Sequence, residues 1–331
     1  MTSAIGRRAF LGVVASGLAA PCVARAQRAS GLPRIGALFP AAPAAAAPNV
    51  EALKQGLRDL GHAEGRTYVL ELRGAADSPD ALSRLAQELV ALKVDVIVAS
   101  TDLAIIAARQ HTSTIPIVMT GATDPVGTGF VASLRQPGGN VTGLSRSSPE
   151  LSGKRLELLR ELMPRLGRVA FVWNPSVLGA PLDYRETEHA ARALRLTLLS
   201  VGVAATEDVE RAFAAVKEQH AQALIVQAPN PVLYSDPARI VGFASANRLP
   251  AIYANRAFVD AGGLMSYGAS VLDLHRRSAA YVDKILKGAR PADLPVERPT
   301  EFELIINRKA AKAIKLTMPP SLLQRATKVI E

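Results

Sequence analysis

Short apolar runs alternate along this chain with segments in which apolar residues recur every three or four positions. Residues 35–39, IGALF, are typical of a buried strand, and residues 49–61 follow with Val50, Leu53 and Leu57 at helical spacing. We expect Asn49 to cap that helix. The alternation continues to residue 267, and strands are expected at 35–39, 67–72, 94–99, 115–119, 141–143, 169–173, 197–201, 223–226, 250–253 and 264–267.

Nearly continuous apolar strands separated by helices are typical of parallel sheets that are covered on both faces. The order runs through five strands and then repeats, which predicts an α/β fold of two Rossmann-like lobes with parallel five-stranded sheets. A helix at 272–286 and a strand–helix unit at 301–314 follow, so we expect the chain to return to each lobe. Lobe 1 is expected to comprise residues 33–146 and about 270–297, and lobe 2 residues 147–269 and about 298–331.

The first 26 residues have the layout of a signal peptide of the twin-arginine type. Arg7-Arg8 precedes an apolar run at 10–20, and Ala24-Arg25-Ala26 offers a cleavage site before Gln27. The apolar run is too short to span a bilayer as a helix. We therefore expect a soluble protein in the periplasm, with the general secretory route as an alternative for its export.

Cys22 is the one cysteine in the 331 residues. It offers an alternative, a lipid anchor, but Pro21 stands before it, where a lipid-attachment site has a small residue such as Gly or Ala. Cleavage after Ala26 leaves a chain without cysteine, which excludes disulfides, thiol catalysis and cysteine–metal sites.

The positive charge of the chain does not indicate a nucleic-acid partner. The formal net charge is +10, and without the three arginines of the leader 36 basic and 29 acidic residues give +7. No block rich in Lys and Arg occurs and aromatic residues are few, whereas nucleic-acid-binding proteins gather basic residues on one face. About 305 residues remain after the leader, which is enough for two domains.

Residues 121–143, GATDPVGTGFVASLRQPGGNVTG, include a glycine-rich turn, but Ala132 stands where the dinucleotide-binding fingerprint needs its third glycine. The chain also lacks a Walker A sequence and a Gly-x-Ser-x-Gly elbow. Its five histidines lack the spacing of metal ligands and are expected on solvated helix surfaces or ends. We expect no cofactor, no metal site and no enzymatic activity.

Polar residues gather where the expected strands end. In open α/β sheets ligands bind beyond the carboxyl ends of the strands, and two lobes joined by several crossings form a hinge beside a cleft. The alternative is that these residues are ordinary helix caps and turn residues. We expect the ligand-binding residues to be Phe39, Thr101, Thr123 and Asp124 in lobe 1, with Asn174, Ser176, Asn230, Tyr253 and Tyr267 in lobe 2.

These residue types suit different parts of a small organic ligand. Asp124 is expected to pair with a ligand cation or to accept hydrogen bonds from ligand hydroxyls. Phe39 or Tyr267 would stack on an apolar portion. Thr101 and Ser176 stand near helix starts, where free backbone N–H groups favour a ligand carboxylate.

Three long stretches resemble a family of ABC-transporter substrate-binding proteins whose best-known members bind tryptophan or tyrosine. They are PIVMTGATDPVGTGFVASLRQPGGNVTG at 116–143, RLPAIYANRAFVDAGGLMSYG at 248–268, and 281–314. The resemblance implies the fold of a type I periplasmic binding protein, with a hinge that the chain crosses three times. It also implies an aspartate near position 230, where this chain has Asn230.

The expected function follows from the fold and the resemblance together. We expect the solute-binding component of an ABC importer, a monomer that closes its cleft like a Venus flytrap on a small organic ligand. That ligand is expected to be an amino acid, aromatic or not, or a related organic acid, and it would pass to a permease in the inner membrane. The alternative is a ligand-sensing protein of the same fold that signals to a membrane receptor.

Overall fold

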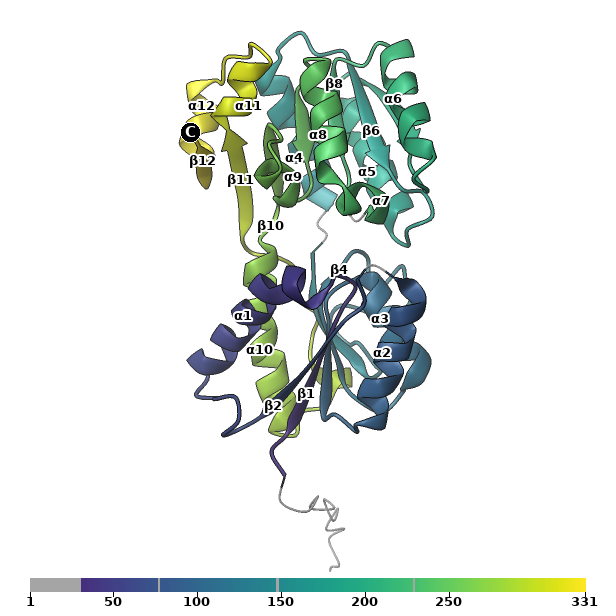
Figure 1. Ribbon diagram of the computed structural model, residues 1–331, viewed down its shortest axis with the longest axis vertical. Helices are drawn as coiled ribbons and strands as arrows, with labels where there is room; N and C mark the ends of the chain where they lie inside the picture. The colour runs from purple at the N-terminus through teal and green to yellow at the C-terminus, as the bar shows by residue number, and fades with distance from the viewer. Residues whose placement is uncertain (1–30, 77, 147–148, 229) are drawn as a thin grey trace, which may run out of the picture. The chain divides into compact units, whose positions relative to one another are not determined.

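The predicted apolar runs form the strands of two separate sheets (Figure 1). The computed structural model describes residues 31–76, 78–146, 149–228 and 230–331. The predicted leader, with Cys22, lies outside the described residues. Both sheets belong to one compact unit, Leu32–Glu331.

Lobe 1, as the name is used from here on, is the first sheet with the helices packed on it. Its elements are β1 (Arg34–Phe39), α1 (Pro43–Asp59), β2 (Val69–Gly74), α2 (Pro79–Ala91), β3 (Val96–Ala99), α3 (Asp102–His111), β4 (Ile117–Ala122), β5 (Val141–Ser145), α10 (Val271–Leu286) and the 3₁₀ turn η1 (Pro291–Asp293). The five strands are parallel, in the order β2-β1-β3-β4-β5. Val96 and Val98 of β3 pack toward α1 and α10, and Ile97 and Ala99 toward α2 and α3, because successive side chains of a strand point to opposite faces.

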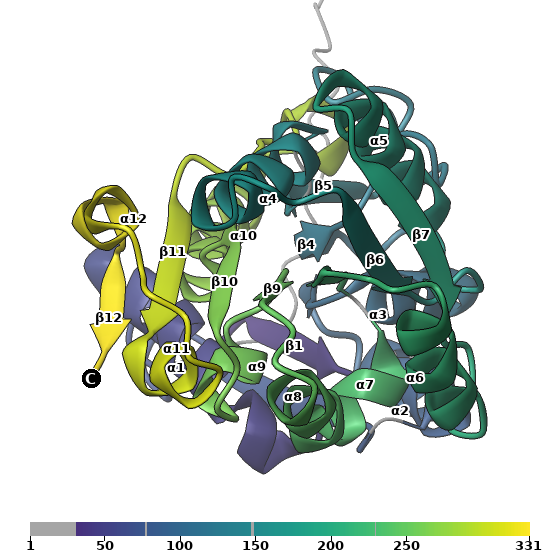
Figure 2. The ribbon, with the colours of Figure 1, turned by 90° about the horizontal axis from the view of Figure 1, so that it is seen from above.

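Lobe 2 is the second sheet with its helices. Its elements are α4 (Pro149–Leu162), β6 (Arg168–Trp173), α5 (Ala180–Ala193), β7 (Thr197–Gly202), α6 (Asp208–Glu218), β8 (Ala223–Val226), α7 (Pro231–Ser235), α8 (Pro237–Ala246), β9 (Ala251–Tyr253), α9 (Ala257–Asp260), β10 (Met265–Ala269), β11 (Phe302–Asn307), α11 (Arg308–Ala313), α12 (Pro320–Arg325) and β12 (Lys328–Ile330). Helices α4 and α5 cover one face, and α6 and α8 cover the other (Figure 2).

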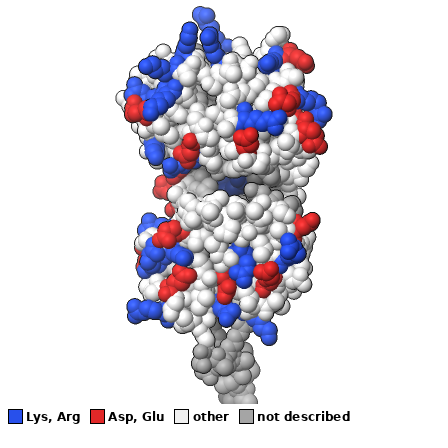
Figure 3. Space-filling view, viewed as in Figure 1, with Lys and Arg blue, Asp and Glu red and all other residues white. Residues whose placement is uncertain are grey.

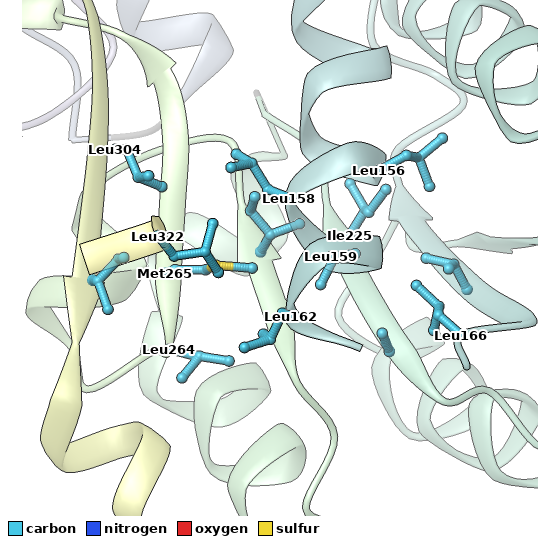
Figure 4. Packing of buried hydrophobic residues seen from close by; sticks show 14 of the residues in the cluster. Leu156, Leu158, Leu159, Leu162, Leu166, Ile225, Leu264, Met265, Leu304 and Leu322 are labelled. Atoms are coloured by element: carbon cyan, nitrogen blue, oxygen red, sulfur yellow. The ribbon is translucent and has the colours of Figure 1, made fainter. Parts of the chain in front are cut away.

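The core beneath α4 holds the second sheet to that helix. Leu159 and Leu162 of α4 pack in one cluster with Ile225 of β8 and Met265 of β10 (Figure 4). Leu322 of α12 is fully buried in the same cluster. Burial of a leucine side chain stabilises a fold by roughly 1.5–3 kcal/mol, so this cluster fixes the position of α4 on the sheet.

The predicted fold class, two Rossmann-like α/β lobes, is confirmed. The second sheet is larger than the five predicted strands, with the order β12-β11-β10-β9-β8-β6-β7. Its five predicted strands are extended by β11, which runs antiparallel to β10, and by β12. The chain passes between the lobes three times, from β5 to α4, from β10 to α10, and from Glu297, which pairs with Leu144, to β11. The residue boundaries predicted for the lobes stay a prediction.

Helix α1 begins at Pro43, so the prediction that Asn49 caps it was wrong. Pro43 occupies a position in the first turn, where the missing N–H has no helical partner in any case. The four residues after it are alanines, the residue type with the highest helix propensity. The helix that begins with these residues continues through Pro48, although a proline inside a helical pattern usually marks a helix boundary.

The expectation that every histidine is solvated was wrong for His275, which is only 1% exposed. Its Nδ1 donates to the carbonyl of Val271 at 2.8 Å, which leaves Nε2 to accept from the hydroxyl of Thr120 at 3.1 Å. The ring stacks on Phe39 with their centroids 5.6 Å apart. Burial lowers the pKa of His275 to about 4, although the Val271 carbonyl acts in the opposite direction.

This buried imidazole makes the stability of the protein depend on pH. The unfolded chain takes up a proton at its ordinary pKa of about 6.5, whereas the folded chain does so near pH 4. The free energy of unfolding should therefore fall as the pH drops through this range, by about 3 kcal/mol at pH 4. Urea unfolding of the wild type and of His275→Gln at pH 7, 5.5 and 4.5 measures the contribution of His275 to the pH dependence of the free energy of unfolding, because the variant lacks the titrating ring. Equal slopes for the two proteins would contradict it.

Candidate functional site

A small cavity of about 40 Å³ lies between the two lobes. Lobe 1 and the segment that enters α10 contribute its walls on one side, and lobe 2 does so on the other. We call this cavity the inter-lobe pocket, and it is lined by Thr123, Arg146, Leu151, Ser152, Arg155, Asp183, Ala228, Ala254, Asn255, Ala269 and Val271.

Buried Asp102 organises the lobe 1 wall of the inter-lobe pocket. Its carboxylate accepts the backbone N–H of Thr123 at 3.0 Å and the hydroxyl of Thr123 at 2.5 Å. Burial raises the pKa of Asp102, while the nearby charge of Arg146 acts in the opposite direction. The two hydrogen bonds tie the first turn of α3 to the end of β4 and fix the side chain of Thr123.

Arg146, directly after β5, connects this network to lobe 2. Its Nη2 donates to the hydroxyl of Thr123 at 2.9 Å and to the carbonyl of Ala228 at 2.8 Å. The same guanidinium therefore bonds to the end of β4 in lobe 1 and to the segment after β8 in lobe 2. Arg146 holds a positive charge in the pocket wall at the place where the lobes meet.

The lobes also touch through a glycine. Gly179, the residue before α5, has a φ of 83°, which lies in the left-handed region that favours glycine. A Cβ atom built on Gly179 would lie 3.0 Å from Cγ2 of Thr123 in the other lobe. A side chain at position 179 would therefore be strained by this φ, and the side chain of Thr123 would have to shift to make room for it.

Arg155 brings a second positive charge to the inter-lobe pocket from α4. It occupies the buried face of that helix and is only 7% exposed. Its Nε donates to the carbonyl of Tyr267 at 2.8 Å. Desolvation lowers the pKa of Arg155 to about 10, and Asp183 opposes this shift. A guanidinium has five N–H donors, and the Tyr267 carbonyl occupies only the one on Nε.

Asp183 of α5 supplies a negative charge in the same wall. The side-chain amide of Gln227, after β8, donates from Nε2 to Asp183 Oδ2 at 2.5 Å and to the carbonyl of Ala228 at 2.8 Å. Gln227 is only 1% exposed. Its Oε1 is buried without a hydrogen-bond partner among the described residues. Leaving such an acceptor unpaired costs about 1–3 kcal/mol.

Among the nine residues predicted from the sequence, Thr123 lines the inter-lobe pocket. Thr101 caps α3 by accepting from the N–H of Ala104 at 3.4 Å. Asp124 accepts the N–H of Gly127 at 2.9 Å inside its own turn. Contact of the last two with a ligand stays a prediction.

The predicted lobe 2 residues lie around the pocket rather than in its wall. Asn174 is buried and accepts the N–H of Ser176 at 2.9 Å, and Ser176 is exposed. Asn230 caps α7 and donates from Nδ2 to the carbonyl of Val203 at 3.3 Å. None of these three residues is among those that line the inter-lobe pocket, and their ligand contacts stay predictions.

The three predicted aromatic residues stack on other rings of the protein. Phe39 stacks on His275. The ring centroids of Tyr253 and Phe258 are 5.0 Å apart, and those of Tyr267 and Phe302 are 6.2 Å apart. Burial raises the pKa of Tyr253. Tyr267 contributes its carbonyl to the site by holding Arg155. Stacking of Phe39 or Tyr267 on a ligand stays a prediction.

Sequence reasoning missed Arg146, Arg155 and Asp183. Arg146 follows the fifth expected strand, so the strand-end rule applied there would have found it. Arg155 repeats with Leu151, Leu158 and Leu162 on the apolar side of a helix, and a charge on that side is a signal of a buried site. Asp183 likewise stands on the buried side of its helix, one turn before Thr187 and two turns before Ala191, which are both buried.

A larger depression of about 670 Å³ lies on the outer surface of lobe 2, lined by Arg308, Lys309, Lys312 and Lys315 among others. It adjoins α11, which follows antiparallel β11 and so lies at the sheet edge opposite the carboxyl end of β10. Ligands of such sheets bind at the carboxyl edge, which favours the inter-lobe pocket as the site.

The surface charges of the described residues are mixed in sign. Figure 3 shows Lys and Arg interspersed with Asp and Glu over the face in view, as expected for solvated helix surfaces. Within the described ranges, no three His, Cys, Asp or Glu side chains gather as metal ligands would. The helices in those ranges are also too short or too polar for a membrane-spanning segment.

Loss of the Asp102 carboxylate should destabilise the protein strongly. In Asp102→Ala the buried hydroxyl and N–H of Thr123 lose their acceptor and Arg146 loses a counter-charge, which we expect to lower the free energy of unfolding by about 3 kcal/mol. Urea unfolding measures the loss. Asp80→Ala is the matched control, because Asp80 is also an acid in a first helical turn but is exposed. Similar small losses in both variants would contradict the assigned role.

Comparisons with known proteins agree with this architecture. Residues 41–330 match the family described as ABC transporter substrate binding protein. A tyrosine-binding protein of Clostridioides difficile is 28% identical over 274 residues, which cover 81% of this chain and 78% of that protein.

Two solved structures are similar over nearly the whole chain. A conserved domain protein of Vibrio cholerae has a TM-score of 0.83 at 28% identity and covers 90% of this chain and 100% of its own. The ABC domain in complex with L-Trp from Streptococcus pneumonia has a TM-score of 0.83 at 25% identity and covers 91% of this chain and 100% of its own. Because the family match spans nearly all of the described residues, the chain belongs to the ABC transporter substrate-binding protein family.

Proposed function

We propose that this chain is the periplasmic solute-binding component of an ABC importer and that its ligand is an amino acid or a related small organic acid. The ligand binds in the inter-lobe pocket, and the loaded protein delivers it to a permease in the inner membrane. The observation that carries the ligand class is the pair of arginines in the pocket wall, one of them buried.

The two arginines suit a carboxylate. Arg155 is desolvated and keeps donors beyond the one that Tyr267 occupies. The positive charge of Arg146 repels that of Arg155, and this repulsion contributes to the lowered pKa of Arg155. An anion between the two guanidinium groups would relieve this repulsion and accept charge-assisted hydrogen bonds, which are roughly twice as strong as neutral ones.

The position of the arginines also couples binding to closure. Arg146 follows the last strand of lobe 1, and Arg155 belongs to lobe 2. A carboxylate that contacts both side chains bridges the lobes, so its binding free energy favours the closed arrangement. The tyrosine-binding relative and the structure with bound L-Trp support an amino acid as the ligand. A permease would then distinguish loaded from empty protein by its closed form.

A thermal-shift screen of the purified protein against amino acids, aromatic acids, sugars and polyamines tests the ligand class. A ligand at ~100 times its dissociation constant should add roughly 2.7 kcal/mol to the free energy of unfolding, which raises the melting temperature by a few degrees. Uptake of the labelled hit by cells with and without the gene then tests the importer role. Hits confined to sugars or polyamines would contradict the proposal.

Arg155→Gln should weaken binding of the carboxylate hit at least tenfold, about 1.4 kcal/mol, because it removes the desolvated charge from the pocket. Isothermal titration calorimetry measures this change. Lys154→Gln is the matched control on the same helix, because the side chain of Lys154 is 40% exposed and pairs with Glu157 at 2.9 Å, away from the inter-lobe pocket. Affinity that is unchanged in Arg155→Gln, or equally reduced in Lys154→Gln, would contradict the role of Arg155.

A further inference from the structure

The two sheets have four edge strands, and three of these edges are protected against pairing with another chain. β2 carries two charged side chains, Glu71 and Arg73, that form ion pairs. β12 is three residues long and includes Lys328. The outer side of β5 is covered by Glu297, which pairs with Leu144. Charged side chains, short strands and covering segments are the usual ways in which proteins protect a sheet edge.

The fourth edge strand, β7, has none of these protections. It is the outermost strand of the second sheet, beside β6 (Figure 2). It is six residues long, and its pairing with β6 runs without a bulge. Its residues Thr197, Ser200 and Gly202 are exposed, and the segment 196–206 includes no charged residue and no proline. An edge strand of this kind is a template for pairing with another strand.

Three residues of β7 offer their backbone groups to such a strand. The N–H of Thr197 donates to the carbonyl of Gly167, on the side of β6. Successive residues of a strand alternate in direction, so the N–H and C=O groups of Leu198, Ser200 and Gly202 point away from the sheet. In the described part of the chain no strand pairs with this side of β7.

An antiparallel copy of the same strand fits these outward groups. In an antiparallel pair, every second pair of opposite residues exchanges two backbone hydrogen bonds. A twofold axis at Ser200 places this residue opposite its own counterpart and Leu198 opposite Gly202 of the second copy. All three outward residues are then paired. An axis one residue earlier or later would leave one of them opposite a residue outside the strand.

The side chains of β7 also suit this arrangement. The fold of one copy does not require Gly202, because its φ is not positive and a Cβ atom built there would make an ordinary contact with Pro175 at 3.7 Å. A glycine inside a strand often marks the close approach of another chain, and here it leaves room for Leu198 of the second copy. On the other face, partly buried Leu199 lies opposite Val201 of the second copy.

The charges that flank β7 are complementary in an antiparallel pair. Arg195 precedes the strand and Glu207 follows it, both are exposed, and neither forms an ion pair with another described residue. Antiparallel pairing brings the basic end of each strand to the acidic end of the other, and opposite charges across two strands stabilise their pairing. This complementarity favours a second copy of the chain over an unrelated strand.

We propose that two copies of this chain pair through β7, antiparallel and with the twofold axis at Ser200, so that their second sheets form one continuous sheet. The dimer replaces the monomer expected from the sequence. Stable interfaces usually bury ~1,200 Å² or more, and two paired strands bury less, so the dimer depends on concentration. The carboxyl ends of the two strands point in opposite directions, which leaves both inter-lobe pockets open.

Analytical ultracentrifugation over a hundredfold range of concentration tests the pairing. The wild type should sediment as a monomer at the low end and increasingly as a dimer at the high end. Ser200→Lys places like charges directly opposite each other at the axis, which should raise the dissociation constant of the dimer about fivefold, and so should Ser200→Asp. An equimolar mixture of these two variants should pair at least as tightly as the wild type, because opposite charges then meet.

Three controls make the result specific to this edge. Ser200→Ala removes the hydroxyl that accepts from Nε1 of Trp173 at 2.9 Å but adds no charge, and it should pair as the wild type does. Ser245→Lys adds the same charge to exposed α8 and should also pair normally. Arg195→Glu lies outside the strand and should weaken pairing even if the charged variants at Ser200 fail to fold, and adding Glu207→Arg in the same chain should restore it.

Four outcomes would overturn the proposal. They are a wild type that stays monomeric at every concentration, a dimer that Ser200→Lys and Ser200→Asp leave unchanged, a mixture of the two that pairs no better than either alone, and equal weakening in Ser200→Ala. A dimer that persists in the charged variants would mean that the copies meet at another surface.

Discussion

The hydrogen bonds of one buried carboxylate hold the lobe 1 wall of the site in place. Asp102 is 3% exposed and bonds twice to Thr123, whose hydroxyl in turn accepts from Arg146. Burying a charge is costly unless it is paired and hydrogen-bonded, so the arrangement is stable only as a unit. Because Arg146 also bonds to Ala228 in lobe 2, the geometry of the whole pocket depends on this buried network.

Much of the fold could be predicted because it depends on patterns that sequence shows directly. A strand such as Val96–Ala99, buried on both faces, has to be continuously apolar, and the ten predicted runs became strands. Of the two strands that extend the second sheet, β11 lies in the strand–helix unit expected at 301–314, whereas β12 was not predicted, for a physical reason. The edge strand Lys328–Ile330 is only partly buried and short, so it lacks that signal. The start of α1 was misplaced because Pro43 and four alanines carry no apolar periodicity although they favour a helix.

The site was harder to predict because it is made by side chains that come together only in three dimensions. The strand-end rule found Thr123, whose position follows from the end of β4. It did not find Arg155 or Asp183, which come from helices of lobe 2 and reach the pocket only through helix packing. Conversely, Asn174 and Asn230 stand at strand ends, but their amides satisfy nearby backbone groups. The sequence therefore shows which polar residues lie at a sheet edge, but it does not show which groups they hydrogen-bond to in the folded protein.

The close approach at Gly179 links how tightly the protein binds to what it binds. Gly179 meets the side chain of Thr123 across the lobes, and Thr123 lines the pocket, so a change at position 179 acts on the contact between the lobes and on the pocket wall together. An apparent dissociation constant is the intrinsic one divided by the fraction of competent molecules. A side chain at position 179 would thus lower the competent fraction for every ligand and, because it would move Thr123 and the hydrogen bond from Arg146, would also alter the ranking of the ligands. The working concentration range and the choice of ligand are therefore tied to each other at this one glycine.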